Sequence, residues 1–440
     1  MRDYTFIDLF SGCGGLSLGF TLAGLKGVFA IEKDSMAFET FAANFLERRA
    51  VPIAKFSWPE WLEKKAWPID DLLSKHPLDL RRLSGQIDIL AGGPPCQGFS
   101  FAGKRKESDP RNQLFEKYVQ VVEAIKPSAI VLENVPGMKV AHAAKVKNAT
   151  GSAEQSYYDK LKTRLEVAGY VVKGKVLDAS CFGVPQRRKR LIVIGIRKEL
   201  SDALVDGPER AFELLEVSRK AQLLSWSLPD NIPACDAISD LRSDLSPRRP
   251  CTDPSSRPGF EEPMYLSPKT TFQKLMHQHS SAGTMDSMRL ARHSEEVRNR
   301  FALILAECSK GVRMNDESRK RFGLKKHRIY PMSPSEPAPT ITTLPDDVLH
   351  YAEPRILTVR ESARLQSFPD WFLFRGKFTT GGTSRVKECP RYTQVGNAVP
   401  PHMARAIGLA LKATLAEAIR AIEKDSRGGK ASKAIRAVAA

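Results

Sequence analysis

The chain has 440 residues, 42% of them apolar, so it can bury a large core and form two or three domains, or one enlarged by an insertion. Its formal charge of +18 suits an extended polyanion such as DNA or RNA better than a small neutral substrate. Seven cysteines without a CxxC pair argue against a disulfide framework and a standard zinc site, so we expect no bound metal. No long apolar run and no signal-peptide pattern are present, which predicts a cytoplasmic protein with no membrane contact.

The first predicted element is a buried strand over residues 4–10, followed by a glycine turn over 11–15 and a helix over 16–25. Strand, glycine turn and helix open nucleotide-binding units, although the spacing here is not GxGxxG and the turn could equally hold no ligand. The next strand, 28–31, ends at Glu32, whose carboxylate can accept hydrogen bonds from both ribose hydroxyls. Asp34 competes for that role, and a solvated helix cap is the alternative reading of Glu32.

A cysteine follows the next buried strand, over residues 87–91, after two glycines and two prolines. Because such a strand must stop and turn, Cys96 is predicted at the carboxyl edge of an open α/β sheet, where ligands bind. A small buried hydrophobe is the commoner fate of a free cysteine. The polar, basic residues 101–111 are interpreted as a lid that closes over a polyanion, or else as a solvated loop.

Glu133 has the same position relative to its strand, 129–132, after a predicted helix over 114–125. If the two strands are parallel neighbours, a thiol and a carboxyl face one crevice, as a nucleophile and a general acid would. Further strands are predicted over 170–177 and 190–197. The second begins with the last of four consecutive basic residues, Arg187 to Arg190, which indicate phosphate or base contact or a solvated turn.

The pattern changes from about residue 200 to 350, where proline, serine and charge increase and strands are hard to find. A short helix capped by Thr358 and a turn over 394–401 before a helix over 402–418 follow. The basic stretch 423–440 is predicted to be a frayed tail.

In this order the motifs resemble the DNA (cytosine-5) methyltransferases of bacterial type, over nearly the whole chain except 200–350 and the tail. The matching residues are Asp8 to Gly15, Glu32, Pro94-Pro95-Cys96-Gln97, Asp109 to Phe115, Glu133-Asn134-Val135, Gln186 to Arg190, Arg360-Glu361 and Gln394 to Asn397. Each motif is short, but their joint order and spacing are specific to this family.

The resemblance implies a Rossmann-like α/β sheet with helices on both faces, S-adenosylmethionine as cofactor, and a smaller irregular target-recognition domain. It implies that a target cytosine flips out of duplex DNA. The Cys96 thiolate would then add to C6, and C5 would take the methyl group. Glu133 would act at N3, and Arg188 and Arg190 would lower the pKa of the thiol and hold the base. The implied cofactor contacts are Phe10, Gly12, Gly14, Glu32, Asp71, Pro95, Leu114 and Asn397, and the implied DNA contacts are Gln97, Ser100, Arg111 and Gln186.

We therefore expect a catalytic domain in two parts, 1–204 and 388–424, a target-recognition domain over 205–387, and a disordered tail over 425–440. Double-stranded DNA is the expected partner, met at a short specific sequence as in restriction-modification. A monomer, a cognate restriction endonuclease and a bacterial, nucleoid-associated location are further expectations. The alternatives are an RNA (tRNA) cytosine-5 methyltransferase and a non-catalytic protein that binds S-adenosylmethionine and nucleic acid.

Two residues depart from the family pattern. Lys33 stands where some relatives have an aromatic residue that stacks on adenine. The acid that would meet the adenine amino group is assigned to Asp71, with Asp70 as the alternative.

Overall fold

A six-stranded sheet forms the centre of the computed structural model, which describes residues 2–47, 53–95, 114–140, 156–280, 285–324, 329–381 and 387–438. The strand order is β2-β1-β3-β4-β6-β5. The first four strands of that order are parallel, and β6 is antiparallel to both neighbours. The strands are β1 (Thr5–Leu9), β2 (Lys26–Ile31), β3 (Ile89–Gly92), β4 (Ala129–Asn134), β5 (Tyr170–Asp178) and β6 (Lys189–Arg197). All six predicted strands are therefore present, and β3 and β4 are parallel neighbours, the condition under which Cys96 and Glu133 were expected to face one crevice.

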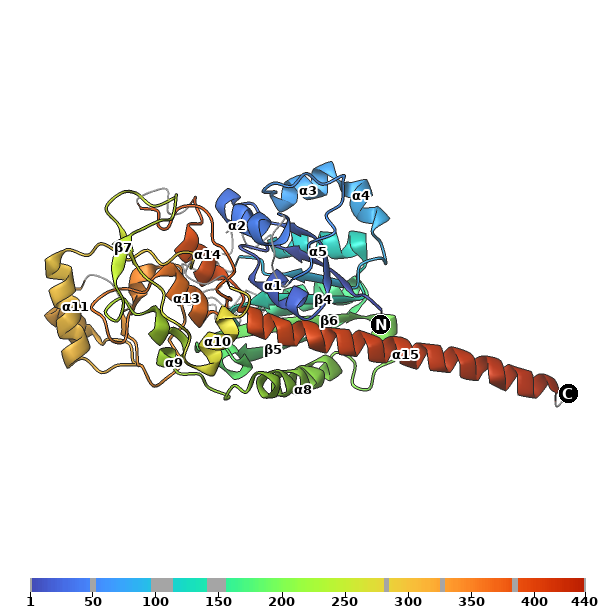
Figure 1. The fold of residues 1–440 in the computed structure, drawn as a ribbon. Coiled ribbons are helices and arrows are strands. Elements are labelled where there is room, and N and C mark those ends of the chain that lie inside the picture. Colours follow the sequence, from blue (N-terminus) through green and yellow to red (C-terminus); the bar gives the residue numbers. More distant parts are fainter. Residues whose placement is uncertain are drawn as a thin grey trace, which may run out of the picture.

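Helices cover both faces of the sheet because successive strand residues point to opposite sides, so that Phe6 joins one apolar cluster and Ile7 the other. The Phe6 side is covered by α1 (Gly15–Leu22), α2 (Ser35–Phe45), α8 (Glu209–Trp226) and α15 (Pro401–Val438). The Ile7 side is covered by α3 (Ile69–Lys75), α4 (Pro77–Arg82), α5 (Leu114–Ile125) and α6 (Tyr157–Val167). Figure 1 shows these layers, with α8 and α15 below the sheet and α3 and α4 above it.

The C-terminal helix packs against the first helix of the chain. A Cβ atom on Gly19 of α1 would lie 2.3 Å from the Cβ of Ala404 and 2.5 Å from the carbonyl oxygen of Pro401. The two helix backbones therefore approach as closely as only glycine permits. This contact joins the two ends of the sheet domain, as the sequence order of the motifs predicts.

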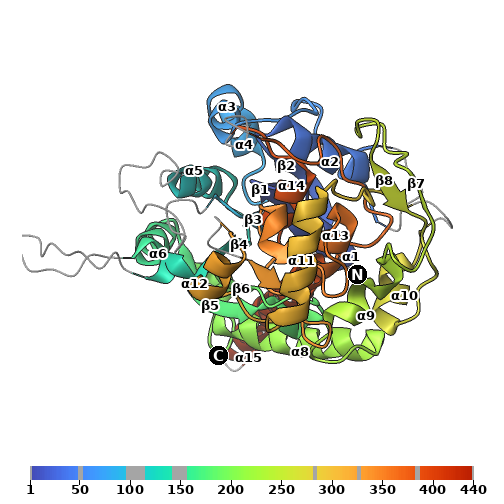
Figure 2. The ribbon, with the colours of Figure 1, turned by 90° about the vertical axis from the view of Figure 1, so that its left-hand side faces the viewer.

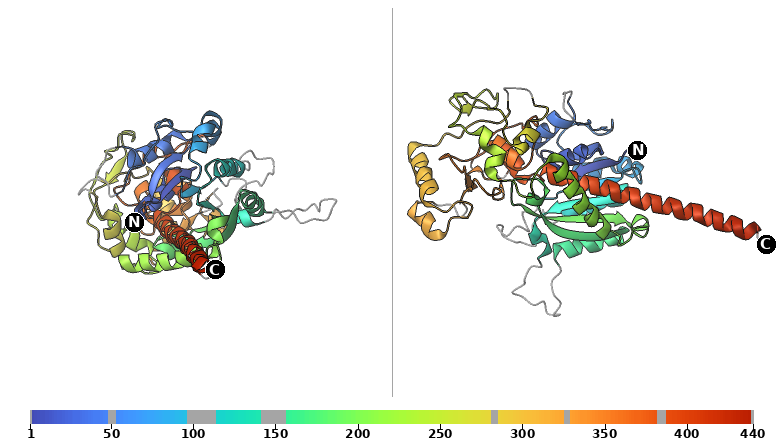
Figure 3. Two further views of the ribbon diagram at one scale, coloured as in Figure 1. Left: turned by 90° about the vertical axis from the view of Figure 1, so that its right-hand side faces the viewer. Right: turned by 60° about the horizontal axis from the view of Figure 1, so that its bottom comes forward.

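The helix continues well beyond its predicted end. It runs as one element to Val438 and projects past the rest of the molecule, as Figures 1 and 3 show, so the expectation of a disordered tail over 425–440 is wrong for residues 425–438. Good helix formers explain the difference, since alanine and lysine recur along this stretch. In α15 the side chains are described as far as residue 425. Among the described helices, none is both long and apolar enough to cross a membrane.

The region between α8 and α13 (Val359–Leu365) is irregular and lies at one end of the sheet domain (Figure 1), the end that faces the viewer in Figure 2. Its strands have two or three residues each, as the low β content of the sequence predicts. Its elements are α9 (Ala234–Ile238), η4 (Ser239–Leu241), β7 (Arg248–Pro250), β8 (Glu261–Pro263), α10 (Thr271–His277), α11 (Glu295–Glu307), α12 (Asp316–Arg321), β9 (Tyr330–Pro331), η5 (Pro345–Asp347) and β10 (Val348–Leu349). The remaining elements are η2 (Pro136–Lys139), η3 (Ala179–Phe182), α7 (Lys198–Ser201) and α14 (Arg391–Asn397).

The packing moves both boundaries expected for this region. Helix α8 follows residue 204, the expected end of the first part of the catalytic domain, but it packs along α15. There Gln222 Nε2 donates to the carbonyl oxygen of His402 (3.0 Å). At the other end, Phe372 packs against Phe45 of α2, with ring centroids 6.2 Å apart. The sheet domain therefore includes α8, and the chain returns to it before residue 388.

Candidate functional site

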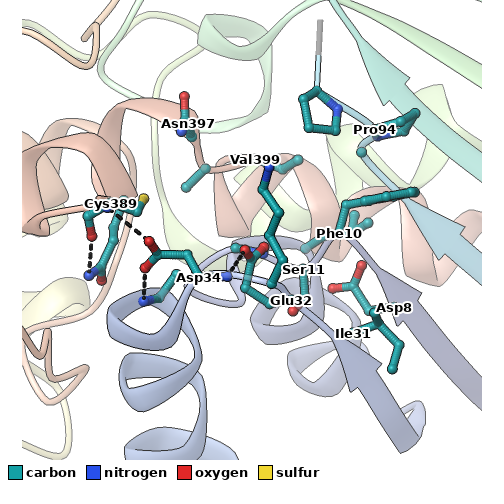
Figure 4. Close-up of a pocket in the computed structure, with 18 of the residues that line it drawn as sticks. Asp8, Phe10, Ser11, Ile31, Glu32, Asp34, Pro94, Cys389, Asn397 and Val399 are labelled. Atoms are coloured by element: carbon teal, nitrogen blue, oxygen red, sulfur yellow. Dashed lines mark hydrogen bonds between the residues drawn. The ribbon is translucent and has the colours of Figure 1, made fainter. Parts of the chain in front are cut away.

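A pocket of about 1440 Å³ opens outside the carboxyl ends of β1, β2, β3 and β4. This is the edge at which open α/β sheets bind ligands. The walls come from distant parts of the chain, namely the turn after β1, the residues after β2, the segments 67–70 and 93–95, the end of β4, the start of β6, and residues 387–399 with gaps. Figure 4 shows the end of the pocket nearest β1 and β2.

Glu32 is held firmly at this end. Its Oε2 accepts the N–H of Gly12 (2.9 Å) and its Oε1 accepts the N–H of Asp34 (2.8 Å), so the carboxylate is fixed between the glycine turn and α2. Gly12 has a φ of +56°, a backbone conformation that glycine adopts without strain. Burial raises the pKa of Glu32 above its ordinary value, while the two backbone N–H groups act against that rise. A fixed carboxylate at the tip of β2 matches the position expected of a ribose acceptor.

Ser11 adds a polar group that the sequence reasoning did not select. It lines the pocket, and its Oγ is buried without a hydrogen-bond partner among the described residues. A buried hydroxyl normally has a partner, so this one is available to a ligand. Its position inside the glycine turn was the only sequence signal that pointed to it.

Asp8 is a second buried acid next to this turn. Its Oδ2 accepts the hydroxyl of Ser17 (2.6 Å), and burial raises its pKa to about 7. Near neutral pH it is therefore only partly ionised, in contrast to an ordinary aspartate.

At the other end of the pocket, Glu133 and Arg190 form an ion pair. Arg190 Nε lies 2.8 Å from Glu133 Oε1, and both side chains are largely buried. The pair forms because β6 runs antiparallel to β4, which places the beginning of β6 at the carboxyl end of β4 (Asn134 opposite Leu191). Glu133 also lies beside the end of β3, since a Cβ on Gly93 would be 3.6 Å from its Oε2.

The backbone of Pro94, just before Cys96 in the sequence, is hydrogen-bonded to the residue that follows Glu133. Asn134 Nδ2 donates to the carbonyl oxygen of Pro94 (3.2 Å), and Pro94 and Pro95 line the pocket. Four sequence-predicted residues (Cys96, Gln97, Ser100 and Arg111) lie outside the described residues, as does the predicted lid.

Arg188 also lines the pocket, but its guanidinium is engaged elsewhere. It is 1% exposed and donates to the carbonyl oxygens of Ile341 (3.1 Å), Gly396 (2.9 Å) and Ala398 (3.1 Å). We expected it to hold the base and to act on the thiol. The structure instead has it fasten the turn after α14 to the start of β6, so its contacts are those of a positioning residue.

Gln186 departs further from expectation, because it is fully buried and has no surface to offer DNA. Its Nε2 donates to Gln366 Oε1 (2.9 Å) and its Oε1 accepts the N–H of Ile341 (2.9 Å). The predicted DNA contact is replaced by a link between the sheet domain and the irregular region. Both partners are more than 150 positions away in sequence, which local reasoning could not detect.

The other predicted cofactor residues divide into two groups. Phe10, Pro95, Leu114 and Asn397 line the pocket with Gly12 and Glu32. Gly14 and Asp71 do not, since Gly14 packs against Phe45 and the Asp71 carboxylate pairs with Lys75 (2.7 Å). Asp70, the alternative to Asp71, does line the pocket and pairs with Lys117 of α5.

Further lining residues had little or no sequence signal. The backbone N–H of Trp67 donates to the carbonyl oxygen of Glu32 (2.7 Å), and the backbone N–H of Cys389 donates to Asp34 Oδ2 (3.0 Å). Lys33, the departure from the family pattern, also lines the pocket and is exposed.

A histidine and two acids lie within metal-binding distance of one another outside this pocket, at His350, Glu353 and Glu361. Arg355 bonds to both carboxylates, and His350 Nδ1 accepts the N–H groups of Ala352 and Glu353. The lone pair of Nδ1 is thus used, the neutral ring carries its proton on Nε2, and that nitrogen cannot ligate. These residues form a buried ionic network rather than a metal centre.

The open sheet and the pocket at its carboxyl edge define the chain as a Rossmann-like α/β protein. Residues 4–413 match the family model of the C-5 cytosine-specific DNA methylases. The chain is 31% identical to the Type II methyltransferase M.DdeI of Desulfomicrobium norvegicum, over 91% of this chain and 86% of the relative. It is also 31% identical to the Type II methyltransferase M.XorII of Xanthomonas oryzae pv. oryzae, over 91% and 83%.

A solved structure from E. coli has a similar fold. It is described as a proposed DNA modification methyltransferase encoded within a prophage, and it matches with a TM-score of 0.59 and 25% identity, over 94% of this chain and 99% of that one. The chain therefore belongs to the C-5 cytosine-specific DNA methylase family, whose enzymes are DNA (cytosine-5-)-methyltransferases.

Proposed function

We propose that the chain transfers a methyl group from S-adenosylmethionine to C5 of a cytosine flipped out of duplex DNA, through a covalent adduct of Cys96. The observation that supports this most directly is the convergence in one pocket of Glu32 at one end and the Glu133–Arg190 pair at the other. The segment 93–95, which precedes Cys96 in the sequence, lines the same pocket.

The pocket fits a nucleoside cofactor with a charged amino-acid tail. Glu32 offers acceptors to the ribose, the free Oγ of Ser11 offers a hydrogen bond, and Trp67 and Ile69 offer apolar contact to a base. Asp70 takes the place of Asp71 as the acid nearest the adenine. Phe10, Pro95, Leu114 and Asn397 complete the proposed set. When bound, S-adenosylmethionine supplies an electrophilic methyl group.

The chain's own residues supply the activation of the cytosine. The Cys96 sulfur adds to C6 as a thiolate, which pushes electron density to C5. Glu133 protonates or hydrogen-bonds N3 and so limits the negative charge on the ring, while Arg190 orients Glu133. After methylation the C5 proton leaves to a base or to water, the C6–S bond breaks, and Cys96 is regenerated.

The irregular region is proposed as the target-recognition domain, with boundaries revised to about 228–357 in accordance with the packing of α8 and Phe372. Recognition by loops suits its short strands. Gln97, Ser100 and Arg111 remain proposed DNA contacts. A short specific target, a partner restriction endonuclease and a monomeric, nucleoid-associated state are proposed from the resemblance to Type II methyltransferases.

The test uses purified protein with S-adenosylmethionine labelled in its methyl group. We expect label at cytosine C5 in duplex DNA but not in tRNA, and loss of transfer in Cys96→Ser with DNA binding retained. Label in tRNA alone, or undiminished transfer by Cys96→Ser, would contradict the proposal. Bisulfite sequencing of DNA from an expressing host would identify the target sequence.

A further inference from the structure

Two side chains of the α2 region hold the segment that joins α13 to α14. We refer to residues 375–381 and 387–389 as the connecting segment. Near its start, the N–H of Arg375 donates to Thr40 Oγ1 (2.8 Å), and at its end the N–H of Cys389 donates to Asp34 Oδ2 (3.0 Å). Both ends of the connecting segment are thus fixed at α2, by two residues, Asp34 and Thr40, that are six positions apart in sequence.

Gln394 of α14 completes this attachment. Its Nε2 donates to the carbonyl oxygens of Arg375 and Cys389 (3.0 Å each), and its Oε1 accepts the hydroxyl of Thr40 (2.6 Å). Gln394 and Thr40 are buried, so these bonds do not compete with water. The backbone N–H and the carbonyl oxygen of both Arg375 and Cys389 therefore have hydrogen-bond partners within one network.

The end of the connecting segment is a wall of the pocket. Residues 387–389 line it, and Figure 4 shows Asp34 between Glu32 and Cys389. The Asp34 backbone N–H fixes Glu32 (2.8 Å), while the Asp34 carboxylate fixes Cys389. A displacement of the wall would therefore be transmitted to the proposed ribose acceptor.

The chemistry of position 34 requires two acceptor oxygens. Oδ1 accepts the N–H of Ala37 (3.0 Å) and so caps α2, while Oδ2 accepts the N–H of Cys389. Asparagine is an equally good cap, but its amide nitrogen cannot accept a hydrogen bond. Asp34→Asn therefore removes one of the two functions and keeps the other.

We propose that Asp34 and Thr40 are positioning residues that set the cofactor affinity of the pocket by fixing its 387–389 wall against α2. This inference rests on the proposed function, because it takes S-adenosylmethionine as the ligand. Thr40 does not line the pocket, so an effect of its hydroxyl on binding must act through the connecting segment.

The experiment measures S-adenosylmethionine binding by calorimetry for the wild type, Asp34→Asn, Thr40→Val and the double variant. We expect each single variant to raise Kd about tenfold, the change that corresponds to one buried hydrogen bond. The double variant should raise it by less than the product, because both changes release the same wall. In turnover, Thr40→Val should raise KM for the cofactor more than it lowers kcat, and Thr40→Ser should restore the wild-type Kd.

Hydrogen exchange supplies a second readout that is independent of the ligand. The amides of 387–389 should exchange faster in Asp34→Asn and Thr40→Val, and at the wild-type rate in Ser294→Ala, which removes the cap of the distant helix α11. If Thr40→Val does not fold, Thr40→Ala replaces it. A wild-type Kd in folded Thr40→Val or in Asp34→Asn, or multiplicative effects in the double variant, would overturn the inference. Failure of the wild type to bind S-adenosylmethionine would instead overturn the proposed function.

Discussion

The contact of Glu133 with Arg190 depends on the direction of β6 as much as on β4, the strand that carries Glu133. The hydrophobic pattern of residues 190–197 predicted a strand but not that it runs antiparallel to β4, and only that direction places Arg190 next to Glu133. The resulting ion pair keeps the carboxylate oriented at the end of β4. An oriented acid is what N3 of a cytosine would require.

Glu133→Gln should reduce methyl transfer about a hundredfold or more, because glutamine keeps the shape but cannot donate a proton as an acid. Single-turnover rates with saturating DNA and cofactor measure the effect. The matched control is Glu417→Gln, which removes a similar pair to an arginine Nε (Arg210, 3.1 Å) outside the pocket. Transfer by Glu133→Gln equal to that of the control would contradict the assigned role.

Asp8 predicts a pH dependence of stability. Its folded pKa is about 7, above the value of about 3.9 in an unfolded chain, so folding favours the protonated form. That contribution is fully present below about pH 4 and is lost as pH rises to about 7. Asp8→Asn cannot ionise and keeps an acceptor for Ser17, so its Tm relative to the wild type should rise between pH 5 and pH 8. Thermal scans without ligand measure this difference, and curves that stay parallel over this range would contradict the prediction.

At the scale of elements, the close contact of α1 with α15 depends on Gly19. Gly19→Ala places a methyl group within 2.6 Å of the backbone of α15, at the carbonyl oxygen of Pro401 and the N–H of Arg405. We expect a loss of about 1–3 kcal/mol in the free energy of unfolding, measured with urea. Gly381→Ala, where no atom of the described residues lies within 4 Å of the new methyl, is the control and should be neutral. Equal midpoints for the two variants would show that the helices can separate without cost.

The elements were predictable where their signals are local. The periodicity of residues 114–125 predicts α5 at its observed bounds, and the glycines and prolines after β3 mark the strand end. Contacts between distant residues were not predictable. Gln186 was assigned to DNA from the family resemblance, yet its partners are Ile341 and Gln366. Cys389 hydrogen-bonds to Asp34, 355 positions away in sequence, and no pattern in either stretch predicts this contact.

At the scale of the molecule, the net charge of +18 predicts how DNA binding responds to salt. Neutralising several phosphates releases counterions, so affinity should fall about a thousandfold between 50 and 200 mM salt. Fluorescence anisotropy with a labelled duplex measures the slope. S-adenosylmethionine binding should change little over the same range, and a DNA affinity equally insensitive to salt would contradict a phosphate-dominated interface.

The closure of the pocket by Ala398 and Val399 has a consequence for biosynthesis. During translation β1 and the glycine turn leave the ribosome almost four hundred residues before the segment that completes their pocket, and Gly15 lies against Val399, whose carbonyl oxygen would be 2.3 Å from an added Cβ. A chain that lacks this segment lacks the part of the pocket wall formed by Ala398 and Val399. Under the proposed function, a chain that stops before this segment should therefore be unable to bind the cofactor normally, even though β1 and the glycine turn are already made.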